Sequence, residues 1–361
     1  MAQCRRSLTP PALVQLTPRC LQKLYKNCYD SGVDEKVLKS SKLRETLFDT
    51  LNSVRSGQVH LIEMYRQPVA ALVSIQAYWE YKRLRAAAHL TSERNTMWRI
   101  VITNVSGGEG KTTLTRELAF ALAARGYAVA LMDTDPQASL TKSLGLHDDP
   151  ASPALTAQQT ILPVFQVSDG PVLPAPIRLL GVDLWPANDE LRKADLEITS
   201  DITRLGNLRE AVDRLEGYDF LLIDTKPGNT PLLVAALAAA DHMVVPVSGI
   251  KGLENLDQLG RLAKAARGHA PDIGIRLFIP NRIRAQVNHH KKVLASLEAY
   301  QTIAPLAPAV RDSLSVVGGA AEVRQPVMVF KPTSDIAQDY EGVAGALLEV
   351  LGVDSKTAVA R

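Results

Sequence analysis

Cysteine is scarce in this 361-residue sequence: Cys4, Cys20 and Cys28 are the only ones. Their odd number and the lack of a Cys-x-x-Cys spacing argue against a disulfide framework, so we interpret them as free thiols. From residue 98 onward cysteine is absent. This excludes an iron–sulfur cluster held by cysteine thiolates in that part of the chain.

Long apolar runs are also missing. No stretch of about 18 uncharged apolar residues occurs, which excludes an obvious transmembrane helix. The first residues, MAQCRRSLTPP, lack the apolar core of a signal peptide. The last ones, LGVDSKTAVAR, lack a basic and apolar face of useful length, which disfavours a surface anchor. We therefore expect a cytoplasmic protein without a membrane partner.

Charge is unevenly distributed, although the formal net charge is only +3. Residues 1–95 contain 15 Lys and Arg against 8 Asp and Glu, whereas the rest contains 26 against 30. A basic N-terminal part before a mildly acidic body suggests a nucleic-acid partner. Lysines that keep a small domain soluble would give the same pattern. The length favours two domains, which we place at 1–95 and 96–361.

Short apolar runs alternate with helical patterns from residue 98 onward. This alternation predicts an α/β fold with a mainly parallel sheet covered by helices on both faces. Ligands of such sheets bind beyond the carboxyl ends of the strands. The Pro-rich segment 148–177 is interpreted as an ordered excursion within this domain. The strand candidates are 98–103, 127–133, 218–224, 242–247 and 275–281.

The region before residue 98 has a different pattern. Residues 40–57 place Leu43, Leu47, Leu51 and Val54 on one helical stripe. Two strand-like runs follow, joined by a short turn at Arg66 and Gln67, and then a second helical run. We expect a small α+β domain of αββα type, and such a small unit is expected to dimerise.

The segment NVSGGEGKTTL, residues 104–114, has the pattern of a phosphate-binding loop. Its glycines let successive N–H groups converge on phosphate oxygens, while the following helix directs its positive end to the same point. In this motif the lysine contacts the β and γ phosphates and the Thr hydroxyl binds Mg²⁺. The expected nucleotide-binding residues are Gly107, Gly108, Glu109, Gly110, Lys111, Thr112 and Thr113.

Acidic residues end two of the expected strands. Asp224 follows the run FLLI and is placed to hold Mg²⁺ through water, together with Thr112 and Asp133. Asp135 lies two residues beyond the end of its strand and is our candidate to orient the attacking water, with Lys111 as the other catalytic residue. Capping of the following helix is the alternative role for Asp133.

Four segments together resemble the ParA/Soj family of partition ATPases. They are NVSGGEGKTT, LMDTDPQASLTKSLGL, YDFLLIDTKPGNTPLLVAALAAADHMVVPV and the tail that begins LAPAVRDSLS. The resemblance covers about residues 98–350. It implies a P-loop ATPase that uses ATP and Mg²⁺, forms a homodimer around the nucleotide and binds DNA non-specifically on the nucleoid. Hydrolysis would be weak without stimulation by a ParB-like centromere-binding protein.

Two positions depart from the family pattern. The family loop carries an additional lysine that contacts the phosphates of the other subunit, and here that position is Ser106. Nucleotide binding is expected to survive because Lys111 remains, whereas dimer-coupled hydrolysis falls into doubt. The family's Asp-Thr-Pro-Pro segment contains Lys226 here. One hypothesis is that Lys226 replaces the missing charge, and the alternative is a solvated loop residue.

The resemblance also implies base- and DNA-binding residues. Asn281, in IPNRIR, occupies the place of the family's adenine-binding asparagine. The candidate DNA contacts are Arg282, Arg284 and Arg311, of which Arg311 matches a DNA-contacting arginine of the family best. Lys291 and Lys292 are further basic residues of this region, and ordinary surface charge is the alternative reading for all except Arg311.

The segment from about residue 36 to 84 resembles the DNA-binding part of Phd/YefM-type antitoxins, in which a dimer places the start of its first helix on an operator. Lys39, Lys42 and Arg44 are then the candidate phosphate contacts. A purely structural dimerisation arm is the alternative. Two other functions stay open for the whole chain: a transcriptional regulator that binds ATP but scarcely hydrolyses it, and a MinD-like positioning protein.

Overall fold

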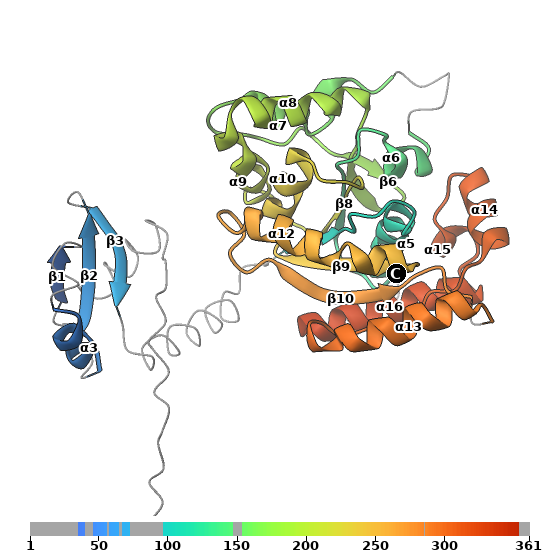
Figure 1. The fold of residues 1–361 in the computed structure, drawn as a ribbon. Helices are drawn as coiled ribbons and strands as arrows, with labels where there is room; N and C mark the ends of the chain where they lie inside the picture. The colour runs from blue at the N-terminus through green and yellow to red at the C-terminus, as the bar shows by residue number, and fades with distance from the viewer. Residues whose placement is uncertain are drawn as a thin grey trace, which may run out of the picture. The chain divides into compact units, whose positions relative to one another are not determined.

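The computed structural model describes residues 35–39, 46–55, 58–64, 67–72, 97–146, 154–284 and 286–353. The chain divides into two compact units, Met1–Arg94 and Asn95–Arg361. Each is described by itself (Figure 1).

The smaller unit contains a three-stranded sheet in the order β1-β2-β3. Strand β2 pairs in parallel with β1 and antiparallel with β3, which forms the expected hairpin. The parallel strand β1 was not expected, and the second helical run lies outside the described residues. Of the expected helix over residues 40–57, the structure describes Leu47–Arg55 as helical, and residues 40–45 lie outside the described residues. The elements are β1 (Glu35–Lys39), α3 (Leu47–Arg55), β2 (Val59–Met64) and β3 (Gln67–Leu72).

The larger unit is built on a seven-stranded sheet in the order β10-β9-β4-β8-β5-β7-β6. The five strands expected from the sequence are present within two residues of their expected bounds and are all parallel. The expected α/β class is therefore confirmed. The strands are β4 (Trp98–Ile102), β5 (Val129–Asp133), β6 (Ile177–Leu179), β7 (Val182–Trp185), β8 (Phe220–Asp224), β9 (His242–Val247) and β10 (Gly274–Pro280).

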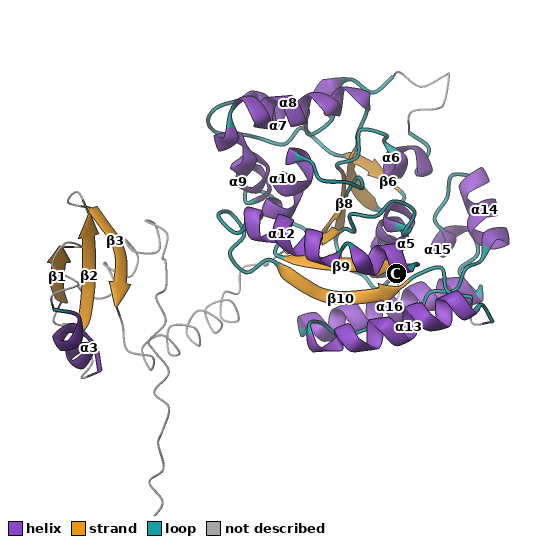
Figure 2. Cartoon of the chain, in the orientation of Figure 1, coloured by secondary structure: helices purple, strands orange, loops and turns teal. Residues whose placement is uncertain are grey.

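Helices cover both faces of this sheet (Figure 2). Their bounds are α5 (Lys111–Ala124), α6 (Ser139–Ser143), α7 (Leu162–Gln166), α8 (Lys193–Ser200), α9 (Asn207–Val212), α10 (Pro231–Ala239), α11 (Ile250–Glu254), α12 (Leu256–Ala266), α13 (Asn288–Ala299), α14 (Leu314–Glu322), α15 (Val327–Phe330) and α16 (Asp335–Leu351). Short 3₁₀ turns are η1 (Ala157–Gln159), η2 (Asp189–Arg192), η3 (Ile202–Gly206) and η4 (Tyr300–Thr302).

Alternating strand residues supply two cores, one on each face. Ile100 and Ile102 of β4 pack with α5 and α16, whereas Val101 packs with the helices of the opposite face, including α10 and α12. This alternation follows from the two-residue period of a strand. Because both faces are buried, the strands read as continuous apolar runs.

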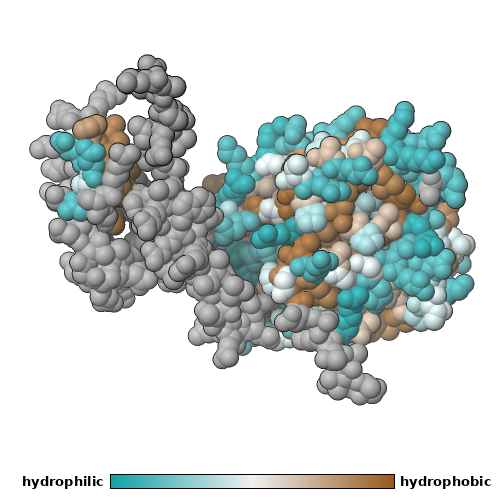
Figure 3. All heavy atoms as spheres, turned by 90° about the horizontal axis from the view of Figure 1, so that it is seen from below, coloured by the Kyte–Doolittle hydropathy of each residue, from teal (hydrophilic) through white to brown (hydrophobic). Residues whose placement is uncertain are grey.

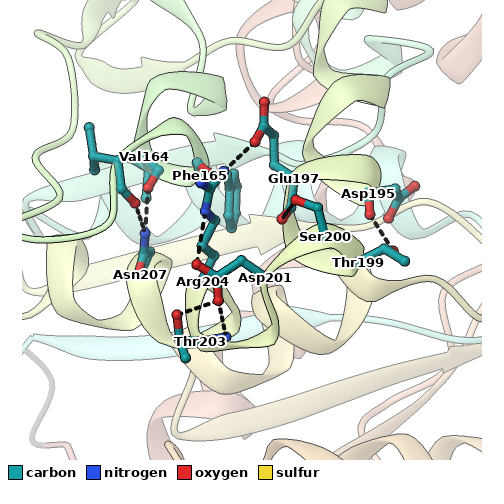
Figure 4. A network of polar contacts seen from close by, with 11 residues as sticks. Val164, Phe165, Asp195, Glu197, Thr199, Ser200, Asp201, Thr203, Arg204 and Asn207 are labelled. Carbon is teal, nitrogen blue, oxygen red and sulfur yellow. Dashed lines mark hydrogen bonds and ion pairs between the residues drawn. The ribbon is translucent and has the colours of Figure 1, made fainter.

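The Pro-rich excursion leads into an antiparallel hairpin of β6 and β7 at one edge of the sheet. Polar contacts hold helices α7, α8 and α9 together (Figure 4). Arg204 donates to the Phe165 carbonyl at 3.0 Å and pairs with Glu197 of α8. Asn207 donates to the Val164 carbonyl at 2.9 Å. Helices α7, α8 and α9 are thereby fixed to one another.

The opposite edge, β10, is also paired. The segment after η4 runs along it, and the Phe278 N–H donates to the Pro305 carbonyl at 2.9 Å while the Val310 N–H donates to the Pro280 carbonyl at 2.8 Å. The surface of the larger unit is mixed, with hydrophobic and hydrophilic residues interspersed on the face in Figure 3.

Candidate functional site

The phosphate-binding loop lies between β4 and α5, at the carboxyl edge of the sheet. Gly108 and Gly110 adopt left-handed backbone angles, with φ of 81° and 78°. A Cβ atom on Gly110 would lie 2.4 Å from Nδ2 of Asn281, which donates to the Glu109 carbonyl at 2.8 Å. Glycine is therefore required at position 110 by both conformation and space.

Lys111 is the first residue of α5, and its side chain is buried. The ammonium donates to the Ser106 carbonyl at 2.8 Å, so it folds back across the loop. Burial lowers the pKa of Lys111, and the carboxylates of Asp224, Glu109 and Asp135 act in the opposite direction. Phosphate oxygens entering the loop would give this buried ammonium a direct anionic hydrogen-bond partner, whereas its hydrogen bond in this structure is to the neutral Ser106 carbonyl.

Asp224 and Asp133 end neighbouring parallel strands and are register partners. Burial, and then the charge of Asp133, raise the pKa of Asp224. Thr115 donates to Oδ1 of Asp224 at 3.2 Å, whereas Oδ2 is buried without a hydrogen-bond partner among the described residues. A divalent cation would supply both the missing partner and the missing positive charge. These residues therefore fit Mg²⁺.

Asp133 is held by three hydrogen bonds from within the protein. Oδ2 accepts from the Thr141 N–H at 2.9 Å and from its hydroxyl at 2.7 Å, while Oδ1 accepts from the Asp135 N–H at 3.0 Å. The Thr141 hydroxyl in turn accepts from the Ala187 N–H at 2.9 Å. This geometry ties β5 to α6 and corresponds to the capping role more than to that of a metal ligand.

Asp135 is buried beside the loop, and its role in orienting the nucleophile stays a prediction. Its Oδ1 accepts from the Gln137 N–H at 2.8 Å, which fixes the carboxylate on the turn after β5. Thr112 and Thr113 are half-buried in the first turn of α5. Their roles stay predictions, as does the part of the loop amides in phosphate binding.

Ser106 directs its side chain into its own subunit. The hydroxyl donates to the Lys251 carbonyl at 2.9 Å and accepts from Nδ2 of Asn255 at 2.8 Å. Asn104 adds a bond from Nδ2 to the Gly252 carbonyl at 3.3 Å. The loop is thus tied to α11 and the start of α12, and the Ser106 hydroxyl already has both a donor and an acceptor partner.

The Glu109 side chain also connects the phosphate loop to neighbouring elements. Its carboxylate accepts from the N–H of Ser248 at 2.5 Å and from the Ser248 hydroxyl at 2.8 Å. A Cβ on Gly252 would come within 2.9 Å of this carboxylate. The side chain therefore faces β9 and α11, and only the main chain of Glu109 is left for the expected nucleotide contact.

Lys226 does not extend freely into the site. Its ammonium donates to Oδ2 of Asp195 at 2.7 Å, and both side chains are largely buried. The hypothesis that Lys226 replaces the missing loop charge is weakened by this pairing.

The candidate DNA contacts lie in three different environments. Arg282 donates to the Gly108 carbonyl at 3.2 Å, so it belongs to the rim of the phosphate loop. Arg284 pairs with Asp312. Arg311 is bound by Asp335 and Asp339 of α16, at 2.8 and 2.7 Å. The side chain of Lys39, at the end of β1, and residues Lys42 and Arg44 lie outside the described parts of the chain.

A small open pocket of about 260 Å³ lies next to the loop. Arg282 and Arg284, two of the candidate DNA contacts, line this pocket. They follow Asn281 at the carboxyl end of β10, and they line a cavity instead of a flat surface. The residues that line it are Ser248, Arg282, Arg284, Val287, His290 and Asp312.

Sequence reasoning missed the residues that hold the phosphate loop from outside it, chiefly Ser248, Lys251 and Asn255. It also missed Asp195, which binds Lys226 in the loop after β8. Only Ser248 carries a usable signal, because it follows the strand 242–247 and strand ends converge at the site. The others act through contacts that no local pattern indicates.

Comparison with known proteins places this site in a family. A family model described as "AAA domain" matches residues 97–269. The chain is 33% identical over 206 residues to the chromosome-partitioning ATPase Soj of Thermus thermophilus, covering 53% of this chain and 76% of that protein. The chain belongs to the ParA/Soj family of partition ATPases.

Other similarities agree with ParA/Soj membership. A probable plasmid-partitioning protein ParA of Thermus thermophilus is 35% identical over 212 residues, which is 56% of this chain. The chain spans only 63% of that relative's length. A structure described as cobyrinic acid a,c-diamide synthase from Mycobacterium smegmatis, with bound ATP analog and magnesium, has a TM-score of 0.58 at 26% identity, covering 71% of this chain and 96% of that one. Across the described ranges of this ParA/Soj protein, no helix combines the length and apolar character needed to cross a bilayer.

Proposed function

We propose that this protein is a DNA partition ATPase that binds ATP with Mg²⁺ and dimerises in the ATP state. The ATP-bound dimer binds DNA non-specifically, and a ParB-like partner stimulates hydrolysis, which releases it. The observation that carries the proposal is the buried Oδ2 of Asp224, which has no hydrogen-bond partner among the described residues and lies one strand from the phosphate loop.

Each residue of the site has a proposed role in nucleotide binding or hydrolysis. The loop amides and Lys111 bind the phosphates, and Thr112 and Asp224 hold Mg²⁺. When bound, Mg²⁺ neutralises charge on the phosphate oxygens. Asp135 orients the water that attacks the terminal phosphate, because its carboxylate is fixed by the Gln137 N–H beside Lys111. Asn281, fixed against the loop, faces the end at which the base is expected.

The two units have different proposed roles. Residues 96–361 form the ATPase, and residues 1–95 form an operator-binding or dimerisation domain whose contacts include Lys39, Lys42 and Arg44. The basic charge of residues 1–95 supports this assignment. Protein bound to DNA in this way would be found on the nucleoid in the cytoplasm.

The decisive experiment combines size-exclusion chromatography with DNA binding, in ATP, in ADP and without nucleotide. Wild type should dimerise and bind DNA in ATP, but not in ADP or without nucleotide. Asp135→Ala should accumulate as an ATP-loaded dimer on DNA because it binds ATP without hydrolysing it. A protein that ignores ATP and Mg²⁺ in a calorimeter contradicts the proposal.

A second function is favoured by Ser106, whose hydroxyl is engaged within its own subunit. In that case the protein is a transcriptional regulator that binds ATP as a ligand and hydrolyses it little. Turnover measured with and without DNA and the centromere-binding partner separates the two: stimulation supports partition, and constant low turnover with operator binding supports regulation.

A further inference from the structure

The nucleotide site is short of positive charge for a triphosphate. The described cations that hydrogen-bond to the loop are the ammonium of Lys111 and the guanidinium of Arg282. The carboxylates at or beside the loop are Glu109, Asp133, Asp135 and Asp224. Even with Mg²⁺, a dimer that encloses two triphosphates needs further cations, since enclosed charges without partners are costly.

Ser106, which stands where the family has the additional loop lysine, cannot contact the phosphates of a second subunit. Ser106 is buried, and its hydroxyl is bound to the Lys251 carbonyl and to Asn255. Lys226, the other candidate near the strand ends, is paired with Asp195. Neither residue is available to reach a second subunit.

Lys251 is placed differently. It is the second residue of α11, and its carbonyl accepts from Ser106 at 2.9 Å and from Asn255 at 3.0 Å, so its backbone is fixed against the phosphate loop. Its side chain is exposed, and the described residues offer it no ion pair. A flexible ammonium on a fixed backbone at the loop rim is therefore free to take an anionic partner.

We infer that Lys251 binds the triphosphate held by the second copy of this chain, and so replaces the cross-subunit charge that position 106 cannot supply. This rests on the proposed ATP-dependent dimer. Gly107 and Gly108 are exposed on the same rim. When two copies meet there with two-fold symmetry, each α11 faces the partner's loop, and the contact is made twice.

The test compares Lys251→Ala, Lys251→Gln and Lys251→Arg by analytical ultracentrifugation with a non-hydrolysable ATP analogue. Loss of a charge-assisted contact should weaken analogue-induced dimerisation roughly ten-fold or more in the Ala and Gln variants. The Arg variant should keep most of it. Lys264→Ala, an exposed lysine on α12, is the matched control and should behave as wild type.

ATP affinity of the monomer, measured by calorimetry below the dimerisation concentration, separates a contact across subunits from one within a subunit. Unchanged monomer affinity with weakened dimerisation supports the inference and also shows that the variant is folded. Equal loss of both, or dimerisation of Lys251→Ala equal to that of Lys264→Ala, overturns it. A wild-type protein that binds the analogue but stays monomeric refutes both the proposed dimer and this contact.

Discussion

Lys226 and Asp195 form an ion pair of 2.7 Å that joins the loop after β8 to helix α8. The other carboxylate oxygen of Asp195 accepts from the Leu232 N–H at 2.8 Å, in the first turn of α10. Asp195 thus connects two helices and a loop, with one bond on each carboxylate oxygen.

Replacing Lys226 by alanine should leave ATP-induced dimerisation within about two-fold of wild type, because the ammonium is held by Asp195 in its own subunit. The free energy of unfolding should fall by about 1 kcal/mol, as for a partly exposed ion pair. Urea denaturation and sedimentation measure the two effects. A large loss of dimerisation with normal stability would restore the hypothesis that Lys226 supplies the missing charge.

Gly110→Ala should abolish nucleotide binding, and Gly126→Ala provides a matched control. Both glycines have a φ near 80°, so both variants pay a similar backbone cost of about 1–2 kcal/mol. Only the Gly110 Cβ meets Asn281, at 2.4 Å, while nothing lies within 4 Å of the Gly126 Cβ. Calorimetry with ATP should therefore distinguish them. Equal ATP affinity of the two variants would show that the loop tolerates the contact.

Asp335→Asn should strengthen non-specific DNA binding if Arg311 is a DNA contact. Arg311 is held by Asp335 and Asp339, and removal of one carboxylate charge frees part of the guanidinium for phosphate. We expect affinity to rise roughly three-fold and the salt slope to steepen by about one phosphate contact. Titrations at several salt concentrations test this.

The control for that variant is Asp189→Asn, which removes the same charge from an exposed aspartate paired with Arg192. It should change DNA affinity only through the net charge. If both variants give the same salt slope, Arg311 is not released toward DNA and the resemblance has misplaced that contact.

His242 should make stability depend on pH below neutrality. Burial, and then the charge of Arg276, lower the pKa of His242 to about 4, and Arg276 donates to Nδ1 at 3.1 Å. Asp241 and Asp272 act against this shift. The folded state keeps the ring neutral, whereas the unfolded chain takes up a proton below its ordinary pKa of about 6.5. The contribution of the neutral His242 ring to stability is therefore fully present above pH 6.5 and is lost as the pH falls toward 4.

The expected slope is at most about 1.4 kcal/mol per pH unit for this one proton. Urea denaturation of wild type and His242→Asn between pH 7.5 and 5 measures it, since asparagine keeps an acceptor near the position of Nδ1. The variant should lose part of the slope that wild type shows. Identical slopes in wild type and His242→Asn would rule out the assignment.

The central strands of the larger unit were predictable because burial on both faces requires a continuous apolar run in the sequence. FLLI before Asp224 and VALM before Asp133 are apolar at every position, as a central parallel strand requires. The hairpin of β6 and β7 was not predicted, since strands of three and four residues are too short to show a period. Strand β1, EKVLK, is mostly charged, and its pairing with β2 is a tertiary contact.

The candidate site was also predictable in part. That Lys111, Asp133, Asp135 and Asp224 converge follows from the strand ends, which the sequence pattern locates. The partners of Ser106, Lys226 and Arg311 do not follow, because each is reached through the packing of a helix distant in sequence. Lys251 and Ser106, for example, are 145 residues apart and meet only because α11 packs against the loop.

The two ends of the seven-stranded sheet bear on how the protein behaves when crowded. On one side the outermost strand, β6, spans only Ile177–Leu179, and on the other the chain from Pro305 to Val310 pairs with Phe278 and Pro280 in the carboxyl half of β10. An incoming chain would meet a strand of three residues at one edge and an already paired carboxyl half at the other. If the proposed DNA binding concentrates many copies in one place, these two edges disfavour strand-to-strand association between them.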